Sequence, residues 1–324
     1  MPSRRNFLAA AAALIVVSTA TAGLAQSYPS KPVRVVVPYP PGGSTDIVAR
    51  VIGEQLSQSM GQRFVVDNRP GAGGNIGMQL AAGAEPDGYT VVVGTTAHAI
   101  NMTLFKDLPY DTVKDFEPIA LLTEIPLILV VNPAVEAQSV ADLIALAKER
   151  PGTLNVASSG NGQSTHLAAE MFNAMAGIKL THVPYKGSAP AITDVMAGHV
   201  QLMFDTVMSA LPHVQAGKLR ALAVSSAERA PVAPDVPTIA EAALPGYEAI
   251  AWNGLFAPAG TPRAIIDQLN AEVVRALQSE KVKEQLASLG ATAQPTTPSD
   301  FSTYVRDEVA KWAKVVKESG ATVE

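Results

Sequence analysis

Residues 33–46 read VRVVVPYPPGGSTD, a valine-rich, strand-like run that breaks into a loop of prolines and glycines and opens directly into a helix. A second junction of the same kind, LNVASSGNGQS, spans residues 154–164. Such a junction points unpaired backbone N–H groups and the positive end of a helix dipole at whatever lies above it. Two junctions this far apart in the sequence suggest two domains that hold one acidic ligand.

The elements around the first junction alternate between strand and helix. Apolar residues recur at helical spacing after it, at Ile47, Val48, Val51, Ile52 and Leu56, which predicts an amphipathic helix over 46–60. Strands are predicted at 64–66 and 89–93, and the loop at 68–75 opens another helix between them. This order predicts a mainly parallel sheet with helices on both faces.

The pattern restarts after Pro126 and predicts a second α/β unit. Its predicted strands are 127–131, 155–157, 181–183, 202–204 and 221–224, and its predicted helices are 139–150, 165–176 and 190–197. A proline-rich stretch then leads to a run at 249–252 and to helices at 262–289 and 298–318. Because these last helices lack a sheet of their own, we expect them to cover the first unit. The chain would then cross twice, near Pro126 and near Trp252, and the two crossings would form a hinge.

The chain has 324 residues, enough for two domains, and its composition of 48% hydrophobic and 16% charged residues is that of a soluble globular protein. Residues 1–25 are typical of an export signal, with Arg4-Arg5, an apolar stretch and small residues before cleavage after Ala25. The segment Ser3–Leu8 fits a twin-arginine signal, and an ordinary Sec signal is the alternative. Both routes take the mature protein out of the cytoplasm.

The chain contains no cysteine, which excludes disulfides, thiolate metal sites, cysteine nucleophiles and lipid attachment through an N-terminal cysteine. We therefore expect a freely soluble mature protein. Removal of Arg4 and Arg5 changes the formal net charge from −5 to −7, which argues against nucleic acid or anionic membranes as partners. We expect a monomer without cofactor or metal.

The loop of the first junction lies at the carboxyl end of a strand, where α/β sheets bind ligands. Prolines stiffen it, glycines permit positive φ and close approach of the backbone, and hydroxyl groups can cap the helix. A tight structural turn without a ligand is the alternative. The residues predicted to contact a ligand here are Tyr39, Pro41, Gly42, Gly43, Ser44, Thr45 and Asp46. We expect Asp46 to stabilise the helix dipole or to hold a water molecule.

The second loop has the same chemistry and contributes Ser159, Gly160, Gly162, Gln163 and Ser164. Neither loop is a phosphate-binding P-loop, because the terminal Gly-Lys-Ser/Thr is missing. A third segment, Thr95, Thr96, Ala97 and His98, follows the third strand and should lie beside the first loop. We expect His98 to cap a helix or to form part of the wall of the ligand site.

Two ionisable residues stand near strand ends of the second unit. Lys186 could face a ligand carboxylate or be a solvated surface lysine. Asp205 could accept a hydrogen bond from a ligand hydroxyl, although bracing of a neighbouring loop is the favoured role.

A secreted serine esterase is a competing interpretation, because Gly162-Gln163-Ser164-Thr165-His166 approaches a nucleophile elbow. The elbow needs glycine two residues after the serine, where this chain has His166. A metal site is not supported, because His166 and Glu170 share a helix face without a third ligand. We expect His182, His199 and His213 to be isolated.

Several motifs in fixed order resemble the Bug family of extracytoplasmic solute receptors. They are PYPPGGSTD (38–46), VDNRPGAGGNIG (66–77), EPDGYT (85–90), VPYKG (183–187) and PGYE (245–248). The resemblance implies a type II-like, two-lobed periplasmic binding protein that closes on a small carboxylate and delivers it to a membrane permease of the tripartite tricarboxylate type. A solute sensor that is not coupled to transport is a further alternative.

The resemblance also implies how the site is built. The loops Pro41–Asp46 and Ser159–Ser164 would hold a ligand carboxylate through backbone amides, hydroxyls and waters, and Thr95–His98 and Asp205 would line the cleft. Lobe 1 would comprise residues 26–126 plus 250–324, and lobe 2 residues 127–249. The motifs do not identify the carboxylate.

Overall fold

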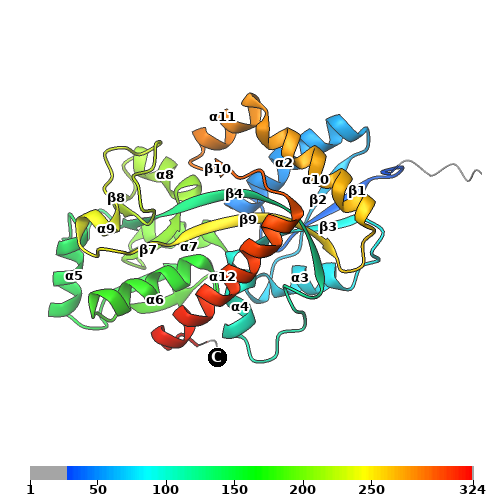
Figure 1. Cartoon of the computed structure of the whole chain (residues 1–324). Helices are drawn as coiled ribbons and strands as arrows, with labels where there is room; N and C mark the ends of the chain where they lie inside the picture. The colour runs from blue at the N-terminus through cyan, green and yellow to red at the C-terminus, as the bar shows by residue number, and fades with distance from the viewer. Residues whose placement is uncertain (1–27, 323–324) are drawn as a thin grey trace, which may run out of the picture.

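The computed structural model describes residues 28–322 and contains two sheets that share one long strand (Figure 1). The expected export signal lies outside these residues. In the first sheet, β1 (Val33–Val37) pairs in parallel with β2 (Phe64–Asn68) and with β3 (Thr90–Thr95). On its other side β3 pairs antiparallel with β9 (Ile250–Pro258), which pairs antiparallel with β4 (Phe116–Val131). The short β10 (Thr292–Ala293) is antiparallel to β4.

The valines of β1 alternate between the two faces of the sheet, so β1 is buried between two layers of helices. Val35 and Val37 belong to the core beneath α2 (Ser44–Met60), whereas Val36 faces the opposite core. That second core contains residues of α3 (Asn75–Ala82) and α4 (Thr96–Leu104), and the short 3₁₀ turn η1 (Ala72–Gly74) precedes α3. Both faces of the first sheet are therefore covered by helices, as predicted.

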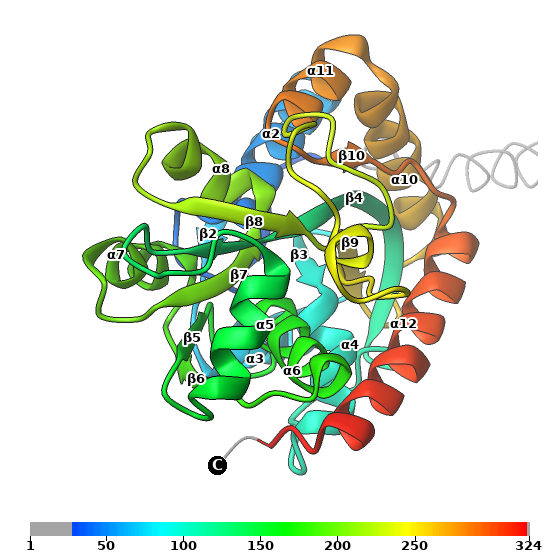
Figure 2. The same cartoon turned by 90° about the vertical axis from the view of Figure 1, so that its left-hand side faces the viewer.

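The second sheet contains the parallel strands β7 (Leu202–Thr206), β5 (Asn155–Ser158) and β6 (Thr181–Pro184). The last residues of β4 pair antiparallel with β7 and with β8 (Arg220–Val224). Helices α5 (Val140–Glu149), α6 (Ser164–Ala176) and α9 (Ile239–Ala242) pack on one face, and α7 (Ser188–Ala197) and α8 (Val207–Gln215) on the other (Figure 2). Each sheet is thus mixed, with a parallel part and an antiparallel part.

The two crossings form a paired ribbon of strands. β4 has 16 residues, whereas the sequence predicted only its last five, because the prolines and glutamates of 117–126 hide its strand character. β4 and β9 pair from Phe116 opposite Pro258 to Pro126 opposite Ile250, and both run through the middle of the molecule (Figure 1). This pairing makes the first sheet mixed, since β9 runs antiparallel to both β3 and β4.

The predicted helix 262–289 is two helices, α10 (Arg263–Gln278) and α11 (Glu280–Ser288). Ser279 separates them, and its hydroxyl caps α11 by accepting a hydrogen bond from the N–H of Val282. α10 packs on α2 and β4, so it covers the first sheet as expected.

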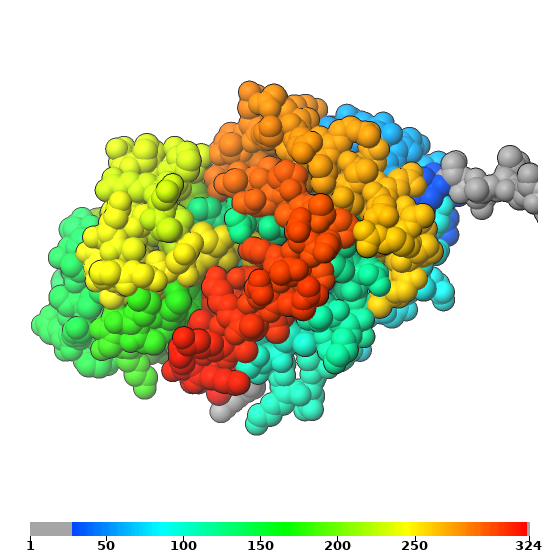
Figure 3. All heavy atoms as spheres, in the orientation of Figure 1, coloured from blue at the N-terminus to red at the C-terminus, as the bar shows by residue number. Residues whose placement is uncertain are grey.

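The last helix, α12 (Pro298–Ser319), reaches further than predicted. It packs on α4 and β4 and also on α6 of the second sheet, and it lies across the surface of the molecule (Figure 3). Its buried Glu308 accepts hydrogen bonds from the indole N–H of Trp252 at 2.9 Å and of Trp312 at 2.8 Å. This carboxylate fixes α12 to β9. Among residues 28–322, no helix combines the length and apolar character needed to cross a membrane.

Candidate functional site

The loops of both junctions open onto one cavity of about 70 Å³, here called the inner cavity. Eleven of the residues predicted from the sequence line it: Tyr39, Pro41, Gly43, Ser44, Thr45, Thr95, Thr96, Ser159, Gln163, Ser164 and Asp205. Residues that the sequence analysis missed complete the wall: Pro40, Thr165, Gly187, Ser188, Ala189, Pro190, Thr206, Ala251, Trp252 and Asn253. The position of Ser188 directly after the Tyr185-Lys186-Gly187 motif is a signal that could have indicated this segment.

Two helix N-termini line the inner cavity. α2 begins at Ser44 and α6 begins at Ser164, and no side-chain hydrogen bond caps the preceding Gly43 or Gln163 in the described part of the chain. The N–H groups of the first two residues of each helix have no partner within their own helix, whereas that of His166 donates to the carbonyl oxygen of Gln163. Because these N–H groups carry the positive end of the helix dipole, the cavity suits an anion.

Asp46 braces the first loop from beside the cavity and is not among the residues that line it. Its carboxylate accepts hydrogen bonds from the N–H of Gly42 at 3.0 Å, from Arg50 at 2.9 Å and from Asn68 at 3.0 Å. Burial opposes ionisation, but these hydrogen bonds outweigh it and hold the pKa of Asp46 below its usual range. Gly42 likewise lies off the cavity, so this part of the loop supports the residues that line it.

Only the first two residues of the third segment, Thr95–His98, line the inner cavity. Thr95 and Thr96 line the cavity, and the Thr95 hydroxyl shares a hydrogen bond of 2.8 Å with the Tyr39 hydroxyl. Ala97 and His98 lie in the first turn of α4, away from the cavity. His98 Nδ1 accepts a hydrogen bond from the N–H of Thr95 at 2.8 Å, which confirms the expected capping role. Burial lowers the pKa of His98 to about 3, so its ring is neutral.

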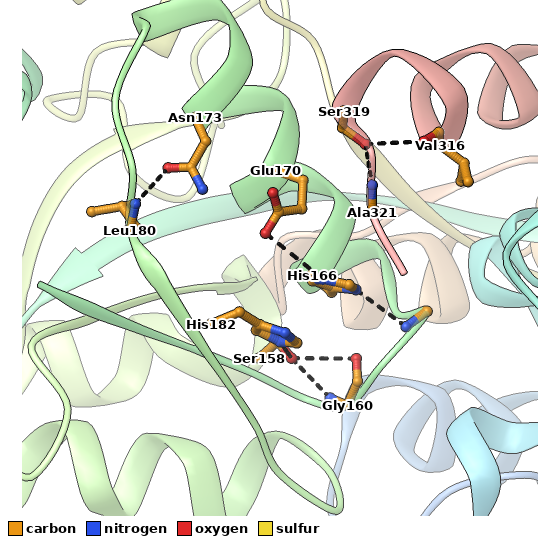
Figure 4. Close-up of polar contacts among 11 residues, drawn as sticks. Ser158, Gly160, His166, Glu170, Asn173, Leu180, His182, Val316, Ser319 and Ala321 are labelled. Carbon is orange, nitrogen blue, oxygen red and sulfur yellow. Dashed lines mark hydrogen bonds and ion pairs between the residues drawn. The ribbon is translucent and has the colours of Figure 1, made fainter. Parts of the chain in front are cut away.

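Two stacked histidines support the second loop (Figure 4). The rings of His166 and His182 lie 3.9 Å apart at an interplanar angle of 11°, so the expectation that His182 is isolated was wrong. Nδ1 of His166 accepts a hydrogen bond from the N–H of Gly162 at 3.3 Å, and Nε2 of His182 lies 2.6 Å from the Ser158 hydroxyl. Burial lowers the pKa of His166 to about 3, with a smaller contribution from His182, and lowers that of His182 to about 4.

This arrangement removes the support for an esterase. The two ring nitrogens of His166 face Gly162 and Glu170, whose carboxylate lies 3.8 Å from Nε2 (Figure 4). Among the described residues, His166 makes no hydrogen bond with Ser164, so this histidine is not placed to activate the serine. Ser164 instead lies at the first position of α6, where it lines the inner cavity.

Asp205 lies at the end of β7 and is fully buried. Its Oδ1 accepts hydrogen bonds of 2.8 Å from the Ser188 hydroxyl and from the N–H of Thr206, which is the bracing role favoured by the sequence analysis. Within residues 28–322, its Oδ2 has no hydrogen-bond partner. Burial raises the pKa of Asp205 to about 7, although both hydrogen bonds oppose this shift.

A second, larger cavity of about 930 Å³ adjoins the first and is here called the outer cavity. The two cavities share five wall residues: Tyr39, Pro40, Ser159, Gln163 and Gly187. Gly160 and the exposed Lys186 line the outer cavity, together with the rings of Phe105 and Tyr185. Gly162 lines neither cavity and packs against Asn101 of α4. The two cavities therefore lie next to each other.

Residues 48–321 match the sequence profile of the tripartite tricarboxylate transporter family receptor. The chain belongs to this receptor family. Among similar solved structures is that of Rpa4515 from R. palustris with adipate, which is 41% identical with a TM-score of 0.89 over 91% of this chain and 100% of that chain. MatC from Rhodopseudomonas palustris with bound malate is 38% identical with a TM-score of 0.85 over 89% of this chain and 100% of that chain. The periplasmic binding protein BugD is 33% identical with a TM-score of 0.87 over 92% of this chain and 100% of that chain.

The two-sheet architecture agrees with that of the similar solved structures. These similarities confirm the two-lobed periplasmic binding protein fold and the resemblance to the Bug family. The protein is a solute-binding receptor of a periplasmic transport family, and this family consists of transport receptors rather than enzymes.

Proposed function

We propose that this receptor captures a small carboxylate anion in the inner cavity and delivers it to a tripartite permease. One observation carries the proposal. Helices α2 and α6 pack on different sheets, yet their uncapped N-termini line the same cavity. Only a guest with negative charge takes advantage of both helix dipoles at once. The similar structures of Rpa4515 and MatC contain adipate and malate, and both of these ligands are carboxylates.

In the proposed complex, the N–H groups of Ser44, Thr45, Ser164 and Thr165 donate hydrogen bonds to the carboxylate, directly or through water. Hydrogen bonds to a charged group contribute about 1.5–3 kcal/mol each, so four of them give roughly 6–12 kcal/mol before the costs of closure. Micromolar affinity requires only about 8 kcal/mol. The site therefore needs no arginine, and none lines the inner cavity as described here.

The distal part of the ligand would occupy the outer cavity. Its rings and prolines suit a short carbon chain, and Lys186 would attract a second carboxylate. A dicarboxylate is thus the ligand class that uses both cavities.

We place the lobe boundaries at 26–126 plus 250–324 and at 127–249. In support, β4 pairs with β9 up to Pro126 opposite Ile250, and from Leu127 onward it pairs with the strands of the second sheet. Bending of this ribbon would open and close the cleft. We further propose that residues 1–25 direct export, by the twin-arginine or Sec route, and that the mature receptor acts as a monomer in the periplasm.

Proline substitutions at the first helical position test the site directly. Proline is well tolerated there, and it removes the backbone N–H that would bind the ligand. Gly43 and Gln163 already have the extended backbone that a following proline requires. We expect Ser44→Pro and Ser164→Pro each to weaken binding of the best ligand from a panel of mono- and dicarboxylates by ten-fold or more in isothermal titration calorimetry.

Ser44→Ala and Ser164→Ala are the matched controls, because they remove the hydroxyl and keep the N–H. Equal effects of proline and alanine would show that the backbone donors do not bind the ligand. Retained carboxylate uptake in a strain that lacks this protein would favour a sensor that is not coupled to transport.

A further inference from the structure

The residues that line the inner cavity present an unusual charge balance for an anion site. They include one carboxylic acid, Asp205, and no lysine, arginine or histidine among the described residues of the wall. An ionised Asp205 and a bound carboxylate would be two negative charges in one cavity, and the described residues of its wall supply no counterion. Like charges in a site of low dielectric disfavour each other strongly, and one of them is normally neutralised by a proton.

The hydrogen bonds of Asp205 determine where such a proton would lie. Oδ1 already accepts two hydrogen bonds, from the Ser188 hydroxyl and the Thr206 N–H. Oδ2 is fully buried and has no partner in the described residues, and Asp205 is one of the residues that line the cavity. A neutral Asp205 would therefore carry its proton on Oδ2 and present an O–H donor to the guest.

We propose that Asp205 is protonated in the complex and donates a hydrogen bond from its Oδ2–H to an oxygen of the bound anion, so that the receptor binds one anion together with one proton. The inference rests on the proposed function and specifies it. It predicts that the group opposite Asp205 is an acceptor oxygen, of a carboxylate or carbonyl, rather than an ammonium group. Dicarboxylates and keto acids are then favoured over amino acids.

No neighbouring charge changes this expectation. The strand β7 that carries Asp205 packs against β4, β5, α6, α7 and α8. The titratable groups on these elements are Glu117, Glu124, His166, Glu170, Asp194 and His213. Glu124 bonds with Tyr304 and Gln294, His166 lies beside Glu170, and Asp194 bonds with Tyr185. Lys186 precedes α7 but lines the outer cavity. Burial raises the pKa of Asp205 to about 7, and its two hydrogen bonds act in the opposite direction.

Calorimetry on the whole mature protein tests the proposal. Adipate, malate and L-glutamate are titrated between pH 6.5 and 8.5 in buffers of different ionisation enthalpy, where simple carboxylic acids stay ionised. We expect adipate or malate to bind with uptake of up to one proton and with an affinity that falls by close to ten-fold per pH unit above the pKa of Asp205. Binding of wild-type protein without proton uptake overturns the inference.

Asp205→Asn supplies the second arm, because its amide N–H replaces the proposed O–H donor. We expect this variant to bind the same anion with an affinity that does not change with pH. Loss of anion binding by folded Asp205→Asn, or preference of wild-type protein for L-glutamate, would show that an ionised Asp205 accepts a hydrogen bond from the ligand instead. If Ser44→Pro and Ser164→Pro weaken binding but no proton is taken up, this inference fails while the proposed function stands.

Discussion

The side-chain amide of Gln163 donates a hydrogen bond of 2.8 Å to the carbonyl oxygen of Gly73, and this bond joins the loop before α6 to the turn η1 beside the first sheet. Close contacts surround it: Gly162 packs on Asn101, and Gly187 packs on Pro40. The two lobes therefore touch directly around the inner cavity. These contacts are therefore the place to test whether the lobes must close for binding.

A methyl group at Gly162 should hold the lobes apart. Gly162 has φ of +75°, and a Cβ built there would overlap Oδ1 of Asn101 on the opposite lobe. We expect Gly162→Ala to lower ligand affinity by ten-fold or more, measured by calorimetry. Gly152→Ala is the control, because Gly152 has φ of +73° and the described part of the chain places no atom within 4 Å of such a Cβ. Both variants carry backbone strain of about 1–2 kcal/mol, so an equal loss of affinity would contradict the closure argument.

Lys186 should distinguish dicarboxylates from monocarboxylates. Its side chain is exposed and lines the outer cavity, so a contact with a second carboxylate contributes about 0.2–1 kcal/mol. We expect Lys186→Ala to weaken adipate binding two- to five-fold and to reduce its dependence on salt, without an effect on a monocarboxylate. Lys179→Ala, an exposed lysine away from both cavities, should change neither. The same loss for both ligand classes would rule out this contact.

The buried histidines should make the protein sensitive to mild acid. Burial lowers the pKa of His98 and of His166 to about 3, below the value of about 6.5 in the unfolded chain. The unfolded chain therefore binds more protons between these values, and the free energy of unfolding falls as the pH is lowered from about 6.5 toward 3. At pH 5 the loss is about 2 kcal/mol for each histidine.

His98→Asn tests this dependence, because the asparagine oxygen can still accept the hydrogen bond from the Thr95 N–H. We expect urea unfolding at pH 7 and pH 5 to show a smaller difference in this variant than in wild-type protein, by about 2 kcal/mol. His199→Asn, at an exposed histidine, is the control. An unchanged pH dependence in His98→Asn would show that the buried ring is not the group that titrates.

Glu308 should be one of the most sensitive positions outside the site. Its Oε2 accepts hydrogen bonds from both Trp252 and Trp312, so Glu308→Ala leaves two buried N–H groups without an acceptor. Each such group costs about 1–3 kcal/mol, and the thermal midpoint should fall by several degrees. Glu318→Ala, at an exposed position of the same helix, should leave the midpoint nearly unchanged. A small effect of Glu308→Ala in calorimetric unfolding would mean that water replaces the carboxylate.

Local chemistry made much of the site predictable. The loops that open α2 and α6 were recognisable because prolines, glycines and hydroxyl residues act on the backbone of their own segment. Eight of the eleven predicted residues that line the inner cavity come from these two loops. The helix α4 was missed, because its first turn was treated as a segment that follows a strand.

By itself, the sequence determined the two α/β units, their order along the chain and the two helix starts, since these depend on the periodicity and backbone preferences of neighbouring residues. Only the tertiary structure decided that β4 and β9 form one ribbon, that His166 stacks on His182, and that Oδ2 of Asp205 has no hydrogen-bond partner among residues 28–322. Those features arise where segments distant in sequence pack together, and the desolvation and hydrogen bonds that control them exist only after the chain has folded.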